Sequence, residues 1–231
     1  MRLAAPGSAE VPDLIGTISL PVGVVTLAER FPDAADKPER FIKAERKAGD
    51  DGRARIEAMA KAAPGKPISS VKLLPPVARP SKVMAAPTNY KAHIAEMAAR
   101  QGTAPEAHRG ISAAGIFLKA NSSIVGQSGV IPLRFPDRLN EHELEIVAVI
   151  GKTGTNIKYE DALDYIAGYS MGLDMTVRGT EDRSFRKAAD TYSVLGPWLV
   201  TADEIPDPDA LDFGIEVNGE VRQRSNTKSL I

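Results

Sequence analysis

The run GYSMGLDMTVRG at residues 168–179 constrains the fold of this 231-residue chain more than any other. It alternates strictly, with Tyr169, Met171, Leu173, Met175 and Val177 on one side and Ser170, Gly172, Asp174, Thr176 and Arg178 on the other. Side chains two apart point to the same face of a β-strand, so this period predicts a strand with one apolar face. Asp174 lies on the opposite, more polar face.

A second run, HELEIVAVIGK at residues 142–152, carries two glutamates at the same spacing. In a strand, Glu143 and Glu145 stand side by side. Residues 146–150 are apolar on both faces, which is typical of a strand buried on both sides. Acids at the mouth of a buried strand need a partner. Paired glutamates on a solvated strand face are the alternative interpretation, because carboxylates are common on exposed surfaces.

Glu143, Glu145 and Asp174 are the candidate metal ligands. Three carboxylates brought together repel one another unless a cation lies between them. Ligands that are all oxygen select a hard divalent ion, Mg²⁺, Mn²⁺ or Ca²⁺.

Size and composition exclude several classes of protein. The length suits one large domain or two smaller ones. The net charge of −1 and the lack of a basic stripe argue against nucleic-acid binding. No apolar run is long enough to span a bilayer, and the first residues lack the apolar core of a secretory signal. The absence of cysteine fits a cytoplasmic location, which we expect.

The organisation of the chain predicts two parts. Residues 15–27 indicate one or two short strands around Pro21 and Gly23, and residues 37–62 indicate two charged helices. A proline-rich stretch follows, and we place a boundary near Pro80. The expected domains are a small α+β domain at residues 1–80 and a β-rich domain at residues 81–231.

The second part is predicted to hold few helices, so the fold class is α+β and β-rich. Strands are expected at residues 83–86, 116–118 and 131–135. Residues 217–221 predict a hairpin, because Asn218-Gly219 favours a type I′ turn. One helix is expected from Tyr90 to about residue 100, capped by Asn89, and a short one at residues 158–166.

His93 and Glu96 are a candidate pair for activating water. Three apart on a helix, they share a face. A carboxylate beside an imidazole fixes its tautomer and raises its basicity. The polar loop at residues 101–113 suits a mobile lid. An exposed helix with two unrelated polar residues, followed by a plain surface loop, is the alternative.

Three cationic residues are candidates for binding an anion. Arg178 follows Asp174 on the same strand face, so it is placed either to bind a substrate carboxylate as a bidentate fork or to form a salt bridge with one of the acids. Lys119 and Lys187 could each contact an anion, with a solvated lysine as the default expectation for both.

Six motifs, in order, resemble the fumarylacetoacetate hydrolase family from about residue 70 to the end: PTNYKAHxxE, IFLKxxSSI, HELEIVAVIGK, AGYSMGLDMTVR, DTYSVLGPWLVT and VNGEVRQxSxT. The resemblance implies a mixed β-sandwich roll, a divalent-metal site and a homodimer. By position it implies that Glu143, Glu145 and Asp174 hold Mg²⁺ or Mn²⁺ and that His93 and Glu96 are the lid dyad. Lys187 would be a third catalytic residue, near the metal and the substrate, with Arg178 and Lys119 as weaker candidates that bind the substrate.

The sequence departs from the family pattern at three points. Arg178-Gly179-Thr180-Glu181 stands where the family usually has Arg-Asp-x-Gln, and Ala120 replaces the usual proline after Lys119. Family members continue beyond the point where this sequence stops. The resemblance therefore implies a C-terminally truncated chain, with a native protein longer by roughly 50–80 residues, enough for a helix and several strands.

The resemblance implies cleavage of a carbon–carbon bond in a 1,3-diketo acid of the acylpyruvate type, with water activated by His93 and Glu96. Decarboxylation, isomerisation or hydration of a 2-oxo acid would use the same site with different proton delivery. A hypothesis of another class is a metal-binding relative or fragment without turnover, because fold resemblance alone does not establish activity.

Overall fold

The computed structural model describes residues 67–77, 79–105 and 111–231, together with two short strands and three single positions nearer the N-terminus. The two strands, β1 (Thr17–Leu20) and β2 (Gly23–Thr26), pair antiparallel, which confirms the strands expected around Pro21 and Gly23. The helices predicted at residues 37–62 lie outside the described residues, apart from those single positions. The domain boundary near Pro80 stays a prediction.

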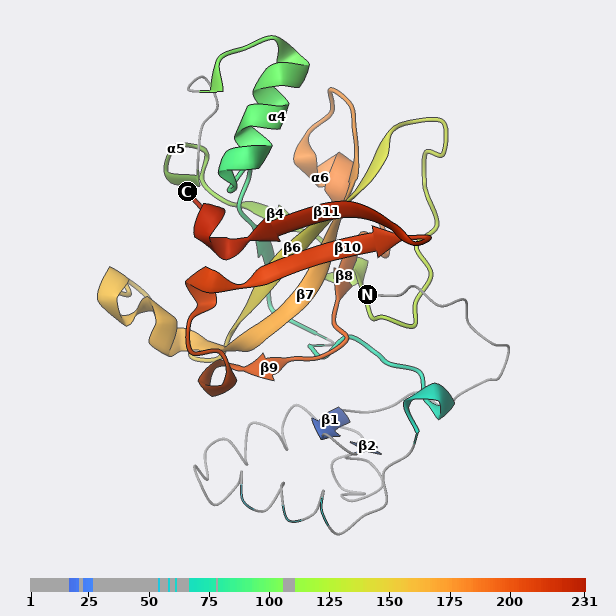
Figure 1. Cartoon of the computed structure of the whole chain (residues 1–231), viewed down its shortest axis with the longest axis vertical. Coiled ribbons are helices and arrows are strands. Elements are labelled where there is room, and N and C mark those ends of the chain that lie inside the picture. Colours follow the sequence, from blue (N-terminus) through green and yellow to red (C-terminus); the bar gives the residue numbers. More distant parts are fainter. Residues whose placement is uncertain are drawn as a thin grey trace.

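A five-stranded sheet forms the centre of the described chain (Figure 1). Its strands, in spatial order, are β5 (Ile124–Val125), β8 (Ser193–Leu195), β7 (Ile166–Val177) and β6 (Asn140–Ile150), with β9 (Val200–Thr201) also paired to β7. β6 and β7 run antiparallel along almost their whole length, whereas β5 and β8 are parallel. The two long strands are those expected from the two runs of alternating and apolar residues.

Two smaller antiparallel pairs complete the sheets of this part of the chain: β3 (Val83–Ala85) with β4 (Phe117–Lys119), and β10 (Asp212–Val217) with β11 (Glu220–Asn226). The β10–β11 turn places Asn218 at φ 54° and Gly219 at φ 84°. A type I′ turn requires positive φ at both central residues, so the predicted hairpin is confirmed.

The β10–β11 hairpin lies across β6 and β7 and covers the apolar face of the sheet (Figure 1). The core beneath it consists of buried apolar residues, among them Leu144, Leu173, Val177, Phe213 and Ile215. The hairpin is also fastened through a side chain, because the Gln223 amide accepts a hydrogen bond from the Leu144 N–H and donates one to the Leu144 carbonyl, both at 2.9 Å.

The expectation that residues 146–150 are buried on both sides is wrong. Ile146 packs against the core, but Ala148 and Ile150 on the same face are exposed. The hairpin covers that face of β6 near Leu144 and leaves its far end open, and β6 is the outermost strand of its sheet. A continuous apolar run therefore overstates the burial of an edge strand.

The helices are short: α4 (Lys91–Gln101), α5 (Ile111–Ala114) and α6 (Arg183–Lys187). α4 confirms the helix expected after Asn89, but its N-cap is Tyr90 without a side-chain cap, so the predicted cap is wrong. The short helix expected at residues 158–166 is the 3₁₀ helix η5 (Tyr159–Tyr165), and no strand forms at residues 131–135. Further 3₁₀ turns are η2 (Ile68–Ser70), η4 (Asn121–Ser123), η6 (Ala202–Glu204), η7 (Pro208–Ala210) and η8 (Thr227–Ser229).

The described chain is thus a mixed α/β fold in which strands dominate. Within it, no helix combines the length and the apolar character that crossing a membrane requires.

Candidate functional site

The three carboxylates predicted as metal ligands lie on neighbouring strands. In the β6–β7 ladder Glu143 is directly opposite Asp174, and Glu145 is opposite Gly172. Residues directly opposite in an antiparallel pair, and residues two apart along one strand, project from the same face. Register and spacing therefore place all three carboxylates on one face of the sheet.

The ammonium group of Lys187 lies between two of these acids. Its Nζ donates to Glu143 Oε2 at 2.6 Å, to Asp174 Oδ2 at 2.7 Å and to Thr176 Oγ1 at 2.6 Å. Lys187 is the last residue of the short helix α6, and the N-cap of this helix is Asp182, whose carboxylate accepts a hydrogen bond from the Ser184 N–H. Lys187 is only 6% exposed, so the default expectation of a solvated lysine is wrong for this residue.

Lys119, at the end of β4, is the second buried counter-ion. Its Nζ donates to Asp174 Oδ1 and, at 2.8 Å, to the carbonyl of Tyr192. Burial lowers the pKa of Lys119, and the charge of Asp174 opposes that shift. The residue is 6% exposed, so here too the solvated default is wrong. Neither lysine reveals this in sequence, because the acids that hold them lie far away along the chain.

Arg178, just beyond β7, forms the salt bridge that was one of its two predicted roles. Its Nη2 donates to Glu143 Oε1 at 2.6 Å, and its Nε donates to Glu141 Oε2 at 2.5 Å. A substrate role for the same guanidinium remains a proposal.

Glu145 differs from its neighbours, because it makes no hydrogen bond or ion pair with the residues that the structure describes. The pKa of Glu145 is raised to about 7, first by burial and then by the nearby charges of Glu143 and Asp174, against the opposing effect of the two lysines. The charge of Glu145 also acts on Tyr90, since burial and then Glu145 raise the pKa of this tyrosine to about 12.

The donor set suits a hard divalent ion. All three candidate ligands are carboxylates, the ligand type that Mg²⁺, Mn²⁺ and Ca²⁺ prefer. A cation beside Glu145 would also offset the repulsion that raises its pKa. In the described part of the chain, no group of three or more His, Cys, Asp or Glu side chains is arranged to hold a metal ion. Lysine and arginine nitrogens occupy the oxygens of Glu143 and Asp174, so these carboxylates would have to exchange a nitrogen partner for the ion.

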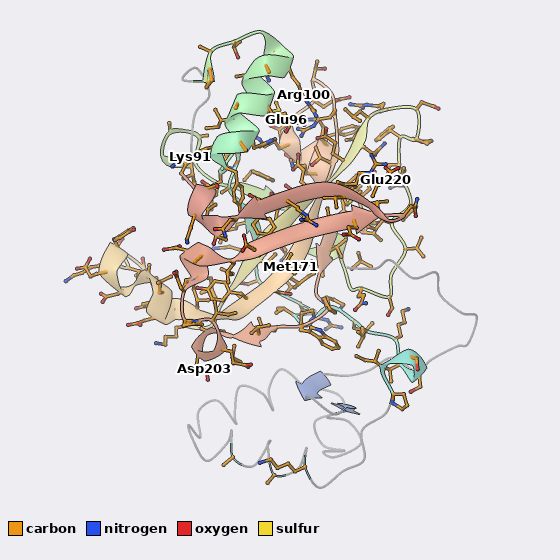
Figure 2. All side chains as sticks on the ribbon, viewed as in Figure 1. Lys91, Glu96, Arg100, Met171, Asp203 and Glu220 are labelled. Atoms are coloured by element: carbon orange, nitrogen blue, oxygen red, sulfur yellow. The ribbon has the colours of Figure 1, made fainter. Side chains whose placement is uncertain are left out.

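The candidate dyad lies on α4, beyond the end of the sheet (Figure 2). His93 Nδ1 is 3.6 Å from Glu96 Oε2, so the two side chains are neighbours without a hydrogen bond. Glu96 Oε1 instead accepts from Arg100 at 2.6 Å. Figure 2 shows Glu96 and Arg100 on the side of α4 that is turned toward α6. Part of the predicted lid loop, residues 106–110, lies outside the described residues.

Two residues of this region escaped the sequence analysis. Arg100 reaches from α4 to β6 and donates to Glu141 Oε1 at 2.8 Å. Burial raises the pKa of Glu141, but the hydrogen bonds from Arg100 and Arg178 outweigh it and leave the pKa below its ordinary value. Both residues had a sequence signal, since Arg100 is four residues after Glu96 on a helix and Glu141 is two before Glu143 on a strand.

Comparison with known proteins gives matches over most of the chain. The family model described as fumarylacetoacetate (FAA) hydrolase, C-terminal, matches residues 82–231. A maleylpyruvate hydrolase of Aquipseudomonas alcaligenes is 50% identical over 182 residues, which are 77% of this chain and 63% of that protein. A mitochondrial oxaloacetate tautomerase of Rattus norvegicus is 38% identical over 170 residues, 71% of this chain and 51% of that protein. The chain thus spans less than two thirds of the length of these two relatives.

A solved structure resembles the chain over a larger share. It is the crystal structure of maleylpyruvate hydrolase from Sphingobium sp. SYK-6 in complex with manganese(II) ion and pyruvate. The match has a TM-score of 0.72 at 32% identity and covers 93% of this chain and 74% of that one.

Proposed function

Because this chain belongs to the fumarylacetoacetate hydrolase family, we propose that it is a divalent-metal-dependent hydrolase that cleaves a carbon–carbon bond in an acylpyruvate such as maleylpyruvate. The observation that carries the proposal is the pairing of Glu143 with Asp174 across β6 and β7, with Glu145 on the same face and Lys187, Lys119 and Arg178 directed at the acids. This arrangement gathers ligands for a hard cation and donors for an anionic substrate in one place.

Glu143, Glu145 and Asp174 would hold the ion, with Mg²⁺ or Mn²⁺ favoured and Ca²⁺ as a third candidate. The manganese in the related maleylpyruvate hydrolase structure supports this choice. When bound, a divalent ion supplies a Lewis acid that polarises the 2-oxo acid oxygens and stabilises the negative charge that develops on the pyruvate half.

The cationic side chains would bind and orient the substrate. Arg178 presents a planar fork of N–H donors suited to a carboxylate, and its Nη2 is already placed on a carboxylate oxygen of Glu143. Lys187 and Lys119 would offset the negative charge of the acids and of the substrate, because both ammonium groups are buried among them.

His93 and Glu96 would activate the water. In the proposed step, water attacks the 4-oxo carbon while His93 accepts its proton and Glu96 holds the imidazole. The bond between C3 and C4 then breaks, its electron pair stays on C3 as the pyruvate enolate, and a proton returned to C3 completes pyruvate. The other product is the carboxylic acid, maleate when the substrate is maleylpyruvate. One water is consumed and no redox change occurs.

Proton transfer without bond cleavage is the second candidate. The oxaloacetate tautomerase that is 38% identical supports it, since a tautomerase acts on a 2-oxo acid and needs only a base and charge stabilisation. Decarboxylation, hydration and a relative without turnover stay as the remaining alternatives. We also infer a β-sandwich roll at residues 81–231, which the family match over residues 82–231 supports, and a small α+β domain at residues 1–80 before it. A homodimer is inferred as well, and light scattering would test it.

The test is to incubate the protein with Mg²⁺ or Mn²⁺ and maleylpyruvate. We expect the diketone absorbance to disappear and pyruvate and maleate to form in equal amounts. The same incubation with oxaloacetate, followed by the exchange between keto and enol forms, tests the second candidate. A protein that binds Mn²⁺ and turns over neither compound would refute both activities.

A further inference from the structure

Glu141 joins two arginines that come from different parts of the fold. Its Oε1 accepts from Nη1 of Arg100 on α4 at 2.8 Å, and its Oε2 accepts from Nε of Arg178 at 2.5 Å. Each carboxylate oxygen thus serves one guanidinium. The helix with the candidate dyad and the arginine beside the candidate metal ligands meet at this one side chain.

Glu141 suits this role because it would keep its partners when an ion binds. Glu143 also contacts Arg178, but Glu143 is a candidate metal ligand and would have to exchange a nitrogen partner for the ion. Glu141 Oε2 contacts both Nε and Nη2 of Arg178. If Glu143 turns to the ion, Nη2 of Arg178 loses one of its two acid partners, so the Nη side of the guanidinium becomes available to a substrate carboxylate while Glu141 keeps the group oriented.

On α4, Arg100 likewise has two partners. It donates to Glu96 at 2.6 Å through Nη2 while Nη1 reaches Glu141. The Arg100 side chain is 46% exposed, and a lone ion pair at that exposure contributes little. Glu141 is only 20% exposed and is shared, so the contact belongs to a network that extends into the acid cluster.

We propose that Glu141 is a positioning residue that couples the position of α4 to the orientation of Arg178, so that the His93–Glu96 dyad lies over the site when Arg178 is set to bind the substrate carboxylate. The catalytic part of this inference rests on the proposed hydrolase function. The mechanical part, that Glu141 and Arg100 hold α4 against β6, rests on the contacts alone.

The experiment compares the intact protein with Glu141→Gln, Arg100→Gln and the rescue variant Arg100→Lys. The control is Glu220→Gln, which makes the same chemical change in an exposed ion pair, with Arg222, at the β10–β11 turn. Four quantities are measured: hydrogen exchange of the α4 backbone amides, the dissociation constant for Mn²⁺, and kcat and KM for maleylpyruvate.

For Glu141→Gln we expect α4 exchange and KM to rise by about tenfold each, the scale of a lost charge-assisted hydrogen bond, with kcat reduced. Arg100→Gln should raise α4 exchange and lower kcat but leave KM within about twofold, because Arg178 keeps its bond to Glu141. Arg100→Lys should recover part of the protection of the α4 amides against hydrogen exchange. The affinity for Mn²⁺ should stay within about twofold in all variants, since Glu141 and Arg100 act on Arg178 and on α4 and not on a proposed ligand.

The two hypotheses fail in different ways. Wild-type exchange in α4 of Glu141→Gln and of Arg100→Gln overturns the coupling, whether or not the enzyme is active. A loss of Mn²⁺ affinity as large as the change in KM also overturns it, because Glu141 would then act on the metal site itself. A wild-type protein without turnover refutes the proposed function, and the exchange measurement still decides whether Glu141 holds α4.

Discussion

Replacing Lys187 with Met tests the charge arrangement of the site most directly. Methionine keeps most of the length of the side chain and removes the charge and the three hydrogen bonds to Glu143, Asp174 and Thr176. In the metal-free protein, the two acids would then face each other with one fewer cation between them. We expect Lys187→Met to be clearly less stable than the wild type under these conditions.

The magnitude follows from burial and from the remaining partners. The side chains are 8% exposed for Lys187, 19% for Glu143 and 11% for Asp174, so solvent screens the pair weakly. Removing one partner of a buried ion pair costs about 3–5 kcal/mol. Glu143 keeps Arg178 and Asp174 keeps Lys119, which puts this case near the lower end, at about 3 kcal/mol. For a chain of this size that corresponds to a Tm lower by about 6–12 °C.

The assay is urea unfolding of the metal-free protein, followed by circular dichroism, with Lys228→Met as the control. Lys228 is exposed, so its replacement should change the free energy of unfolding by less than about 0.5 kcal/mol. Adding Mn²⁺ should raise the free energy of unfolding of Lys187→Met by more than it raises that of the wild type. The ammonium holds two oxygens of the proposed ligands, so its removal should tighten Mn²⁺ binding by about tenfold.

A loss below about 1 kcal/mol, the value of an exposed ion pair, would refute the reasoning, since it would mean that water screens the cluster in solution. Unchanged or weaker Mn²⁺ binding by Lys187→Met would refute the second part, because the ion and the ammonium would then not compete for Glu143 and Asp174.

The remaining predictions concern three other side chains. His93→Ala should lower kcat by about 10²-fold or more and leave Mn²⁺ binding intact, and wild-type turnover would make His93 a surface residue. Glu145→Ala should abolish metal-dependent turnover at little cost in stability, since it removes a carboxyl whose pKa is raised by burial and by repulsion from the other acids, so an active variant would exclude Glu145 as a ligand. Gln223→Leu should destabilise the protein by about 1–3 kcal/mol, because both polar groups of Leu144 lose their partner, whereas an unchanged urea midpoint would show that water replaces the amide.

The sequence predicts the parts of this structure that depend on local rules. The period of two in residues 168–179 identified β7, and Asn218-Gly219 identified the β10–β11 turn, because both signals reside in neighbouring residues. The prediction that Glu143 and Glu145 share a face also depends only on residues close together in the sequence. The register that brings Asp174 opposite Glu143 is not, because it depends on how the two long strands pair.

The errors arise where long-range packing overrides a local pattern. The apolar run predicted that Ala148 and Ile150 are buried, but the hairpin that covers β6 does not extend to them. Lys119 and Lys187 were expected to be solvated, yet both are buried against Asp174 of β7, Lys119 at the end of β4 and Lys187 at the end of α6. A lysine is expected at the surface unless it is paired, and the pairing is visible only once the sheet is assembled.

The balance of charge in the site indicates that binding of the ion would favour binding of the substrate. The network contains five acids, Glu96, Glu141, Glu143, Glu145 and Asp174, and four cationic residues, Arg100, Lys119, Arg178 and Lys187. With all of them ionised the cluster carries one negative charge, so a divalent ion held by the acids would leave it with one positive charge in a partly buried place. Uncompensated charge there is costly. A carboxylate of the keto acid would offset that charge, and Arg178 would be placed to bind it as Glu143 turned to the ion. In such a site the metal would provide affinity for an anionic substrate as well as its activation, and Glu141 would keep Arg178 in place through the exchange.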